Sequence, residues 1–169
     1  NDDDYVDDIA KDLVSTVCEI LRKQHNAVGS SYAPNIIPTT THLHFGSLTG
    51  ATPDGRKSGN PLSEGVSPAQ GRDMNGPTCV ARSVVKLPLS RCYGALLNQK
   101  FNPTVLSGTD GIEKFASLWR TYFQLGGYHA QFNIISAETL REAQRNPEAH
   151  RNLIIRVAGY SDYFVRLNK

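Results

Sequence analysis

The stretch with the clearest chemical character lies near the C-terminal end, where one glycine ends an apolar run at residues 153–159. Apart from Arg156, the residues before Gly159 are aliphatic, and several are β-branched. A run this short and apolar is typical of a strand or tight loop buried on both sides. A glycine inside such a run usually marks a bulge or a close backbone approach. The missing Cβ also leaves the glycine Cα open to a reactant.

The residues around this glycine resemble the signature of the glycyl radical enzymes, the family of pyruvate formate-lyase and glycerol dehydratase. The resemblance implies that Gly159 loses a hydrogen from Cα and stores an unpaired electron on the backbone. Without a Cβ the Cα can flatten, and the flanking amide nitrogen and carbonyl can share the spin. The other signature residues are implied to shape the loop and not to react: Arg156, Val157, Ala158, Tyr160, Ser161 and Phe164.

The resemblance also implies how the radical arises and where it goes. A separate activating enzyme, with an iron–sulfur cluster and S-adenosylmethionine, would take the hydrogen from Gly159. A cysteine of the parent enzyme would then pass the radical to substrate. Cys18, Cys79 and Cys92 do not lie in the family's cysteine-loop context, so we expect each to be structural. No permanently bound cofactor or metal is expected. Because dioxygen should attack a glycyl radical, the host is expected to be anaerobic or facultative.

The fold that the resemblance implies is α/β, namely the C-terminal part of the family's ten-stranded α/β barrel, with a buried glycyl radical loop. Residues 1–60 are expected to form the end of the barrel domain. Residues 61–169 are expected to form the glycine radical domain, incomplete at its C-terminus. The chain has 169 residues and starts at Asn1, whereas family members are several times longer. We therefore expect a C-terminal piece of a larger enzyme, which as a whole would be a homodimer.

Residues 35–45 have the pattern of a strand with a proline near its start. On a strand His42 and His44 would point to one face. Two histidines alone do not make a metal site, because no third ligand is suggested nearby. The resemblance places this strand along the barrel wall, which makes Ile37, Thr39, His42 and His44 candidates to face substrate. Diol dehydratases of the family carry a tyrosine where Ile37 stands, which argues against a diol.

The remaining chain divides into helices, strands and one long loop. Helices are predicted at 5–24, at 78–87 after Pro77, from a capping box at Asp110–Glu113 to Gly126, and at 136–144 behind Ser136. Strands are predicted at 94–101 and 128–135. Residues 46–77 are rich in glycine and proline and read as a long functional loop without P-loop or dinucleotide spacing.

Composition excludes several classes of function. The net charge is +2, and the sequence lacks a basic run with interleaved aromatic residues, so nucleic acid is not an expected partner. It also lacks an apolar segment of membrane-spanning length and a signal-peptide pattern. Three cysteines without CxxC spacing argue against a disulfide framework. A reducing cytoplasm fits this composition.

Three functions remain open. The first is a fragment of a glycyl radical lyase that acts on a small molecule and cleaves a C–O, C–N or C–C bond, as dehydratases and decarboxylases do. The second is a fragment of a formate C-acetyltransferase. The third is a non-catalytic spare part that replaces a damaged radical domain, although residues 1–60 exceed what a spare part needs. The first is favoured.

Overall fold

The computed structural model describes residues 2–167; residues 1, 168 and 169, which end the two predicted domains, lie outside the described part. The α-helices are α1 (Asp4–Arg22), α2 (Thr41–Leu48), α3 (Gly76–Val85), α4 (Gly108–Gln124) and α5 (Ala137–Arg145). The strands are β1 (Asn35–Ile36), β2 (Gly94–Ala95), β3 (Asn98–Phe101), β4 (Gln131–Ile134), β5 (Ile154–Arg156) and β6 (Ser161–Tyr163). Short 3-10 turns cover Leu89–Arg91, Pro103–Leu106, Pro147–His150 and Phe164–Arg166.

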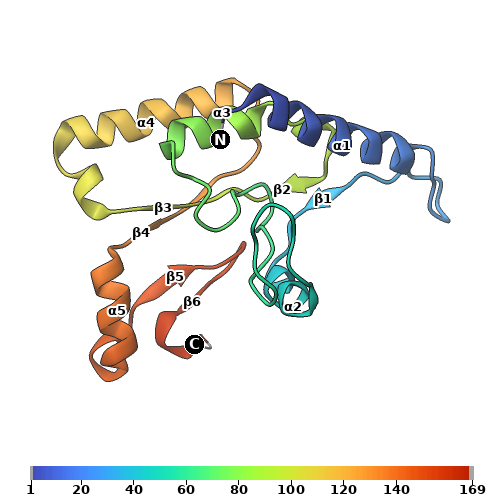
Figure 1. Cartoon of the computed structure of the whole chain (residues 1–169). Coiled ribbons are helices and arrows are strands. Elements are labelled where there is room, and N and C mark those ends of the chain that lie inside the picture. The colour runs from blue at the N-terminus through green and yellow to red at the C-terminus, as the bar shows by residue number, and fades with distance from the viewer. Residues whose placement is uncertain (1, 168–169) are drawn as a thin grey trace.

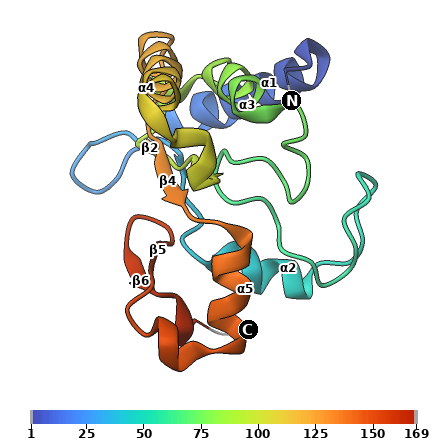
Figure 2. The ribbon, with the colours of Figure 1, turned by 90° about the vertical axis from the view of Figure 1, so that its left-hand side faces the viewer.

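Helices α1, α3 and α4 form a layer above the four short strands β1 to β4 (Figure 1). Strand β1 pairs in parallel with β2, and β3 pairs in parallel with β4. Parallel neighbours need a crossover connection, which α4 supplies between β3 and β4. Helix α5 and the antiparallel pair β5–β6 lie below these strands, on the side away from the helical layer (Figure 2).

The hydrophobic core lies between the helical layer and the strands, and aromatic rings dominate it. Trp119 on α4 stands 4.7 Å from Phe132 on β4 and 6.3 Å from Phe101 on β3, measured between ring centroids. The first pair is tilted and the second is edge-to-face. Aromatic pairs in such arrangements add to the free energy gained by burying the rings. Tyr122 is 1 % exposed and donates from its hydroxyl to the His129 carbonyl at 3.1 Å. This packing fixes the ends of β3 and β4, from which the site residues project.

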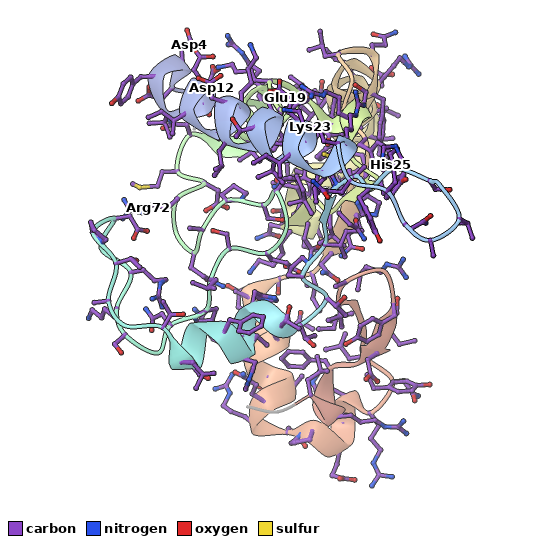
Figure 3. The ribbon with its side chains drawn as sticks, turned by 90° about the vertical axis from the view of Figure 1, so that its right-hand side faces the viewer. Asp4, Asp12, Glu19, Lys23, His25 and Arg72 are labelled. Carbon is purple, nitrogen blue, oxygen red and sulfur yellow. The ribbon has the colours of Figure 1, made fainter. Side chains whose placement is uncertain are left out.

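Helix α1 agrees with the predicted helix at 5–24 apart from its exact ends. Asp3 caps its start by accepting from the amides of Tyr5 and Val6. Charged residues line its outer side, as Asp4, Asp12, Glu19 and Lys23 show in Figure 3. Much of the predicted apolar stripe is exposed, however, including Ile9 (54 %) and Leu13 (65 %).

A charge cluster attaches α1 to the residues that follow α3. The Lys86 ammonium lies 2.7 Å from carboxylate oxygens of both Asp4 and Asp7. Asp7 is 9 % exposed and also accepts from the Ser83 hydroxyl at 3.0 Å. The hydrogen bond to Asp4, and then the one to Asp7, raises the pKa of Lys86. The acidic helix start therefore holds a cation as well as matching the helix dipole.

The predicted strand at 35–45 is wrong beyond Ile36, because the chain turns and enters α2. Thr39 has φ of +57°, a left-handed conformation that ends the extended backbone. The amide of Thr41 then donates to the Pro38 carbonyl at 2.9 Å, which closes the turn. Residues two apart on a helix point about 200° from each other. His42 and His44 therefore do not share a face, contrary to the prediction.

The other predicted elements are confirmed in type and differ in extent. The predicted strand at 94–101 is two strands, because β2 and β3 pair with different partners. The capping box at Asp110 is wrong, since α4 starts at Gly108 and the Asp110 carboxylate pairs with Lys114. Ser136 does cap α5, because its hydroxyl accepts from the Thr139 amide at 3.0 Å. Residues 49–75 contain no helix or strand, in agreement with the predicted loop.

Candidate radical site

The glycine that the sequence singles out lies in the turn of the β5–β6 hairpin. Arg156 pairs with Ser161 at the end of the ladder, and the amide of Val157 donates to the Tyr160 carbonyl at 2.9 Å. Gly159 is the third residue of this four-residue turn and has φ of +77°. A turn of type II requires a positive φ at its third position, which favours glycine there. The turn geometry therefore gives one reason for a glycine at this position.

Asn133 on β4 holds the end of β5 as a neighbouring strand would. Its side-chain nitrogen donates to the Arg156 carbonyl at 2.8 Å, and its side-chain oxygen accepts from the Arg156 amide at 2.7 Å. One amide side chain thus satisfies both backbone groups of a residue that precedes the turn. The hairpin is fixed to β4 at this point by a side chain.

Gln131 reaches the turn itself and is 6 % exposed. Its side-chain nitrogen donates to the Val157 carbonyl at 2.8 Å. Its side-chain oxygen accepts from the Gly159 amide at 3.2 Å and faces Nε of Arg156 at 3.4 Å. Two donors face the oxygen and one acceptor faces the nitrogen, so only this orientation of the amide satisfies all three groups.

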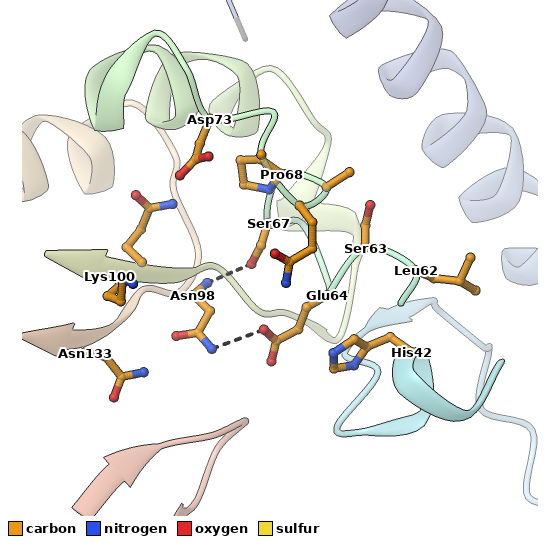
Figure 4. Close-up of a pocket in the computed structure, with 14 residues that line it drawn as sticks. His42, Leu62, Ser63, Glu64, Ser67, Pro68, Asp73, Asn98, Lys100 and Asn133 are labelled. Atoms are coloured by element: carbon orange, nitrogen blue, oxygen red, sulfur yellow. Dashed lines mark hydrogen bonds between the residues drawn. The ribbon is translucent and has the colours of Figure 1, made fainter. Parts of the chain in front are cut away.

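Asn98 on β3 supplies a third amide contact. Its side-chain nitrogen donates to the Val157 carbonyl at 3.0 Å and to Glu64 at 3.2 Å, while its backbone amide donates to the Ser67 hydroxyl at 2.9 Å. Figure 4 shows Asn98 between Glu64 and Ser67, with Asn133 on the next strand. The loop at 63–68 is thereby joined to β3, and through Asn98 to the turn.

The contacts of the remaining signature residues agree with a loop-shaping role. Ala158 is buried, and the Arg156 guanidinium donates to the Ser161 hydroxyl at 3.3 Å across the hairpin. The Phe164 amide donates to the Leu153 carbonyl at 2.8 Å, which closes the base of the hairpin. Tyr160 is 41 % exposed.

Gly159 itself is exposed in this chain, so the expected burial of the loop is not formed by residues 2–167. A Cβ built on Gly159 would find no heavy atom within 4 Å. Gly159 is exposed because it lies at the tip of the hairpin, whereas the nearby Val157 carbonyl makes the contacts with Asn98 on β3 and with the side-chain nitrogen of Gln131 on β4. One Cα hydrogen is therefore directed into open space.

The four residues expected to face substrate do not gather at one place. His42 lines a cavity of about 370 Å³ with Glu64, Asn98 and Asn133 (Figure 4). Ile37 is 39 % exposed and lies beside Gly94, where a Cβ would come within 3.0 Å of the Ile37 side chain. Thr39 and His44 are exposed on the turn and on α2. His42 shares this cavity with Asn98 and Asn133, which contact the β5–β6 hairpin.

The Arg156 guanidinium places a positive charge beside the turn of the hairpin. Burial, and next the charge of Arg156, lowers the pKa of His129 below its usual 6.5. His129 is consequently neutral at pH 7 and adds no second positive charge. The guanidinium of Arg156 can then interact with the neutral oxygens of Gln131 and Ser161.

The cysteines lie among the packed helices and short turns. Cys18 is fully buried on α1, and Cys92 is 7 % exposed. Burial raises the pKa of the Cys92 thiol to about 11, so this thiol is protonated at neutral pH. Within residues 2–167 all three cysteines are free thiols, and no group of three or more metal-binding side chains is found. The described helices include none long and apolar enough to cross a membrane.

In the sequence analysis, Gln131, Asn133 and Asn98 received no role beyond membership of predicted strands. The signal available was the alternation Gln131-Phe-Asn133, which places two amides on one face of β4 and a core phenylalanine on the other. That pattern indicates a strand with a polar face. It does not show that the amides bind the backbone of a turn some 25 residues further on.

Comparison with known protein families shows the class to which the chain with this arrangement belongs. Residues 62–165 match the family model described as Glycine radical, and residues 1–46 match the one described as Pyruvate formate lyase-like. The first match covers more than half of the chain. The chain belongs to the glycyl radical enzyme family.

Individual relatives agree with this assignment. The chain is 43 % identical over 169 residues to trans-4-hydroxy-L-proline dehydratase of Clostridioides difficile, covering 100 % of this chain and 21 % of the relative. It is 42 % identical over 174 residues to isethionate sulfite-lyase of Nitratidesulfovibrio vulgaris, covering 99 % of this chain and 21 % of that protein. It spans about a fifth of the length of these relatives.

Solved structures confirm the predicted fold class. The glycerol-bound B12-independent glycerol dehydratase of Clostridium butyricum superimposes with a TM-score of 0.94 at 47 % identity, over 99 % of this chain and 22 % of that chain. Because the likeness extends over nearly all of this chain, its fold is that of the C-terminal part of the family's α/β barrel.

Proposed function

We propose that this chain is the radical-storing part of a longer glycyl radical enzyme and that Gly159 carries the radical. One observation carries the proposal. Gly159 stands in a positive-φ turn, its amide is held by Gln131, and one Cα hydrogen faces open space. A partner can therefore reach that hydrogen without displacing a side chain of this chain.

In this proposal a separate activating enzyme, with an iron–sulfur cluster and S-adenosylmethionine, takes one hydrogen atom from the Gly159 Cα. A cysteine in the remainder of the longer protein then gives the hydrogen of its thiol to the Gly159 radical, and the resulting thiyl radical takes a hydrogen atom from a small substrate. Cys18 and Cys92 are poor candidates for this cysteine, because both are buried in the described chain. The full-length enzyme is proposed to be a cytoplasmic homodimer without nucleic-acid or membrane partners.

The reaction we propose is a lyase reaction, such as elimination or decarboxylation at a C–O, C–N or C–C bond. The names of the relatives support this class, since they include a dehydratase, a sulfite-lyase and an indoleacetate decarboxylase. These names support a lyase reaction over the formate C-acetyltransferase reaction. The match of residues 1–46 to the lyase-like model argues against a spare part, which would need only the radical domain.

The two matched segments also support the proposed domains, a barrel end at 1–60 and a glycine radical domain at 61–169. Residues 47–61 fall between the two family matches. Most of this interval lies in the long loop, where Arg56 donates hydrogen bonds to carbonyls of Thr49 and Asn60 and organises the turn. A boundary in such a loop interrupts no helix or strand.

Oxygen cleavage tests the proposed radical site. The full-length protein is co-expressed anaerobically with its activating enzyme, exposed briefly to air and examined by intact-mass analysis. We expect a cut at Gly159 that releases the residues after it, and no cut in Gly159→Ala. An uncut chain, under conditions that activate and cleave a known glycyl radical enzyme, would contradict the proposal.

A further inference from the structure

The Gln131 side chain contacts the turn on both sides of Ala158, at the Val157 carbonyl and at the Gly159 amide. We propose that Gln131 is a positioning residue for the radical, which fixes the peptide plane before Gly159 and accepts its N–H. The inference rests on the proposed function, because it concerns the same glycine. It assigns a role to a residue outside the signature.

The strands explain why Gln131 can hold the turn firmly. It is the first residue of β4 and lies opposite Asn98 in the parallel ladder. Its own amide donates to the Leu97 carbonyl at 2.9 Å, so its backbone is anchored in the sheet. With the side chain 6 % exposed, few other rotamers are open to it. A buried amide whose oxygen and nitrogen both have partners is a rigid support.

The hydrogen bonds of the Val157 carbonyl show that side chains outside the hairpin hold the turn. It accepts from Asn98 at 3.0 Å and from Gln131 at 2.8 Å, and these two donors use its two lone pairs. An ordinary two-residue hairpin would offer this carbonyl to the amide at the far end of the turn. Here the amide side chains of β3 and β4 take that place, so the conformation at Gly159 depends on them.

The contact at the Gly159 amide bears on the radical itself. Removing one hydrogen atom from Cα leaves an unpaired electron that is shared with the nitrogen lone pair and the carbonyl. An acceptor on the N–H increases electron density on that nitrogen and so stabilises the electron-poor Cα. Because Gln131 accepts at 3.2 Å in the closed-shell chain, the contact exists before the radical forms. A preformed contact costs no rearrangement at the moment of hydrogen loss.

Three variants of the full-length protein, activated anaerobically, separate this role from simple support of the fold. Gln131→Met keeps the length of the side chain and removes both contacts. Gln131→Glu keeps the acceptor for the Gly159 amide and loses the donor to Val157. The control is Gln99→Met, which alters an amide on β3 that has no contact with the turn among the described hydrogen bonds. Electron paramagnetic and electron–nuclear double resonance in H2O and D2O give the radical yield and the coupling of the exchangeable amide proton.

We expect Gln131→Met to reduce the radical yield about tenfold, the effect of losing the hydrogen bond to the Gly159 amide, and to shift the amide-proton coupling. Gln131→Glu should keep the wild-type coupling, and Gln99→Met should match wild type in both readouts. Unchanged coupling and yield in Gln131→Met would overturn the inference. If Gln131→Met gives no signal, Gln131→Glu decides: a wild-type coupling supports the role and a lost signal overturns it. A wild-type protein without any radical would instead contradict the proposed function.

Discussion

Asn133 and Arg156 are 23 residues apart and are joined by two hydrogen bonds that mimic a strand pair. The Asn133 nitrogen donates to the Arg156 carbonyl at 2.8 Å, and the Asn133 oxygen accepts from the Arg156 amide at 2.7 Å. The β5–β6 hairpin is thus attached to β4 by side-chain amides in addition to its own ladder. Each amide can be altered without breaking a backbone ladder.

Asn133→Asp should destabilise the chain by about 2 kcal/mol, because the Arg156 carbonyl loses its donor and faces a carboxylate oxygen. The acceptor for the Arg156 amide stays, so the loss reports on the contact with the Arg156 carbonyl. Asn102→Asp is a matched control, since Asn102 only accepts, from the Thr104 amide at 3.2 Å. Urea unfolding of the chain measures both. Equal effects of the two substitutions would contradict the assigned contact.

Gly159→Ala should cost only the strain of a positive φ, about 1 kcal/mol, because its Cβ finds open space. Gly65→Ala should cost clearly more. Gly65 also has a positive φ, and its Cβ would collide with the Leu96 carbonyl and approach the Ile36 carbonyl at 3.1 Å. Urea midpoints of the two variants compare strain with and without a collision. A larger loss at Gly159 would contradict the open space described there.

Lys86→Met should lower the urea midpoint, because it leaves the buried Asp7 carboxylate without its cation. The pKa of Lys86 is raised above 10.5, so its stabilisation is complete below pH 10.5 and is lost as pH rises through the raised pKa. With Asp7→Asn in the background, Lys86→Met should cost less. A double-mutant cycle measures this difference. Simple additivity would show that Lys86 and Asp7 do not interact.

Stability should also fall at high pH because of Tyr122. Burial raises its pKa from 10.0 to about 12, so the unfolded chain loses the phenol proton first. The stabilisation is present below about pH 10 and disappears as pH rises through 12. Tyr122→Phe should be less stable at pH 7, where the bond to His129 is lost, and should show a flatter slope above pH 10. Parallel slopes in urea unfolding from pH 9 to 11 would contradict this.

The helices that could be predicted from the sequence are those specified by residues close together in the chain. The apolar spacing of α1, Pro77 at the start of α3 and Ser136 before α5 each indicate a helix through contacts within a few residues. The same reasoning failed at 35–45, where β-branched residues favour a strand. There the left-handed Thr39 and the turn at Pro38 decide the outcome, and neither is visible in residue type.

The sequence singled out the glycine of the candidate site but not the amide residues that hold its turn. Gly159 could be singled out because glycine in an apolar run is unusual and the residues around it form a specific sequence motif. Gln131, Asn133 and Asn98 act over 23 to 59 residues, and only the parallel pairing of β3 with β4 brings them to the turn. Sequence motifs alone do not show which strands pair, so these contacts could not be predicted. The four candidates to face substrate were placed on one strand, whereas the chain turns at Thr39 and then forms α2, so the shared strand is wrong and their contact with substrate stays a prediction.

The measurement that tests the central claim most directly is the paramagnetic resonance spectrum of the activated full-length protein made with α-deuterated glycine. A radical on Gly159 keeps one Cα hydrogen and should give a doublet, which should collapse to a single line when that hydrogen is deuterium. Gly159→Ala should abolish the signal. A doublet that survives deuteration, or a signal that persists in Gly159→Ala, would place the radical elsewhere and contradict the account.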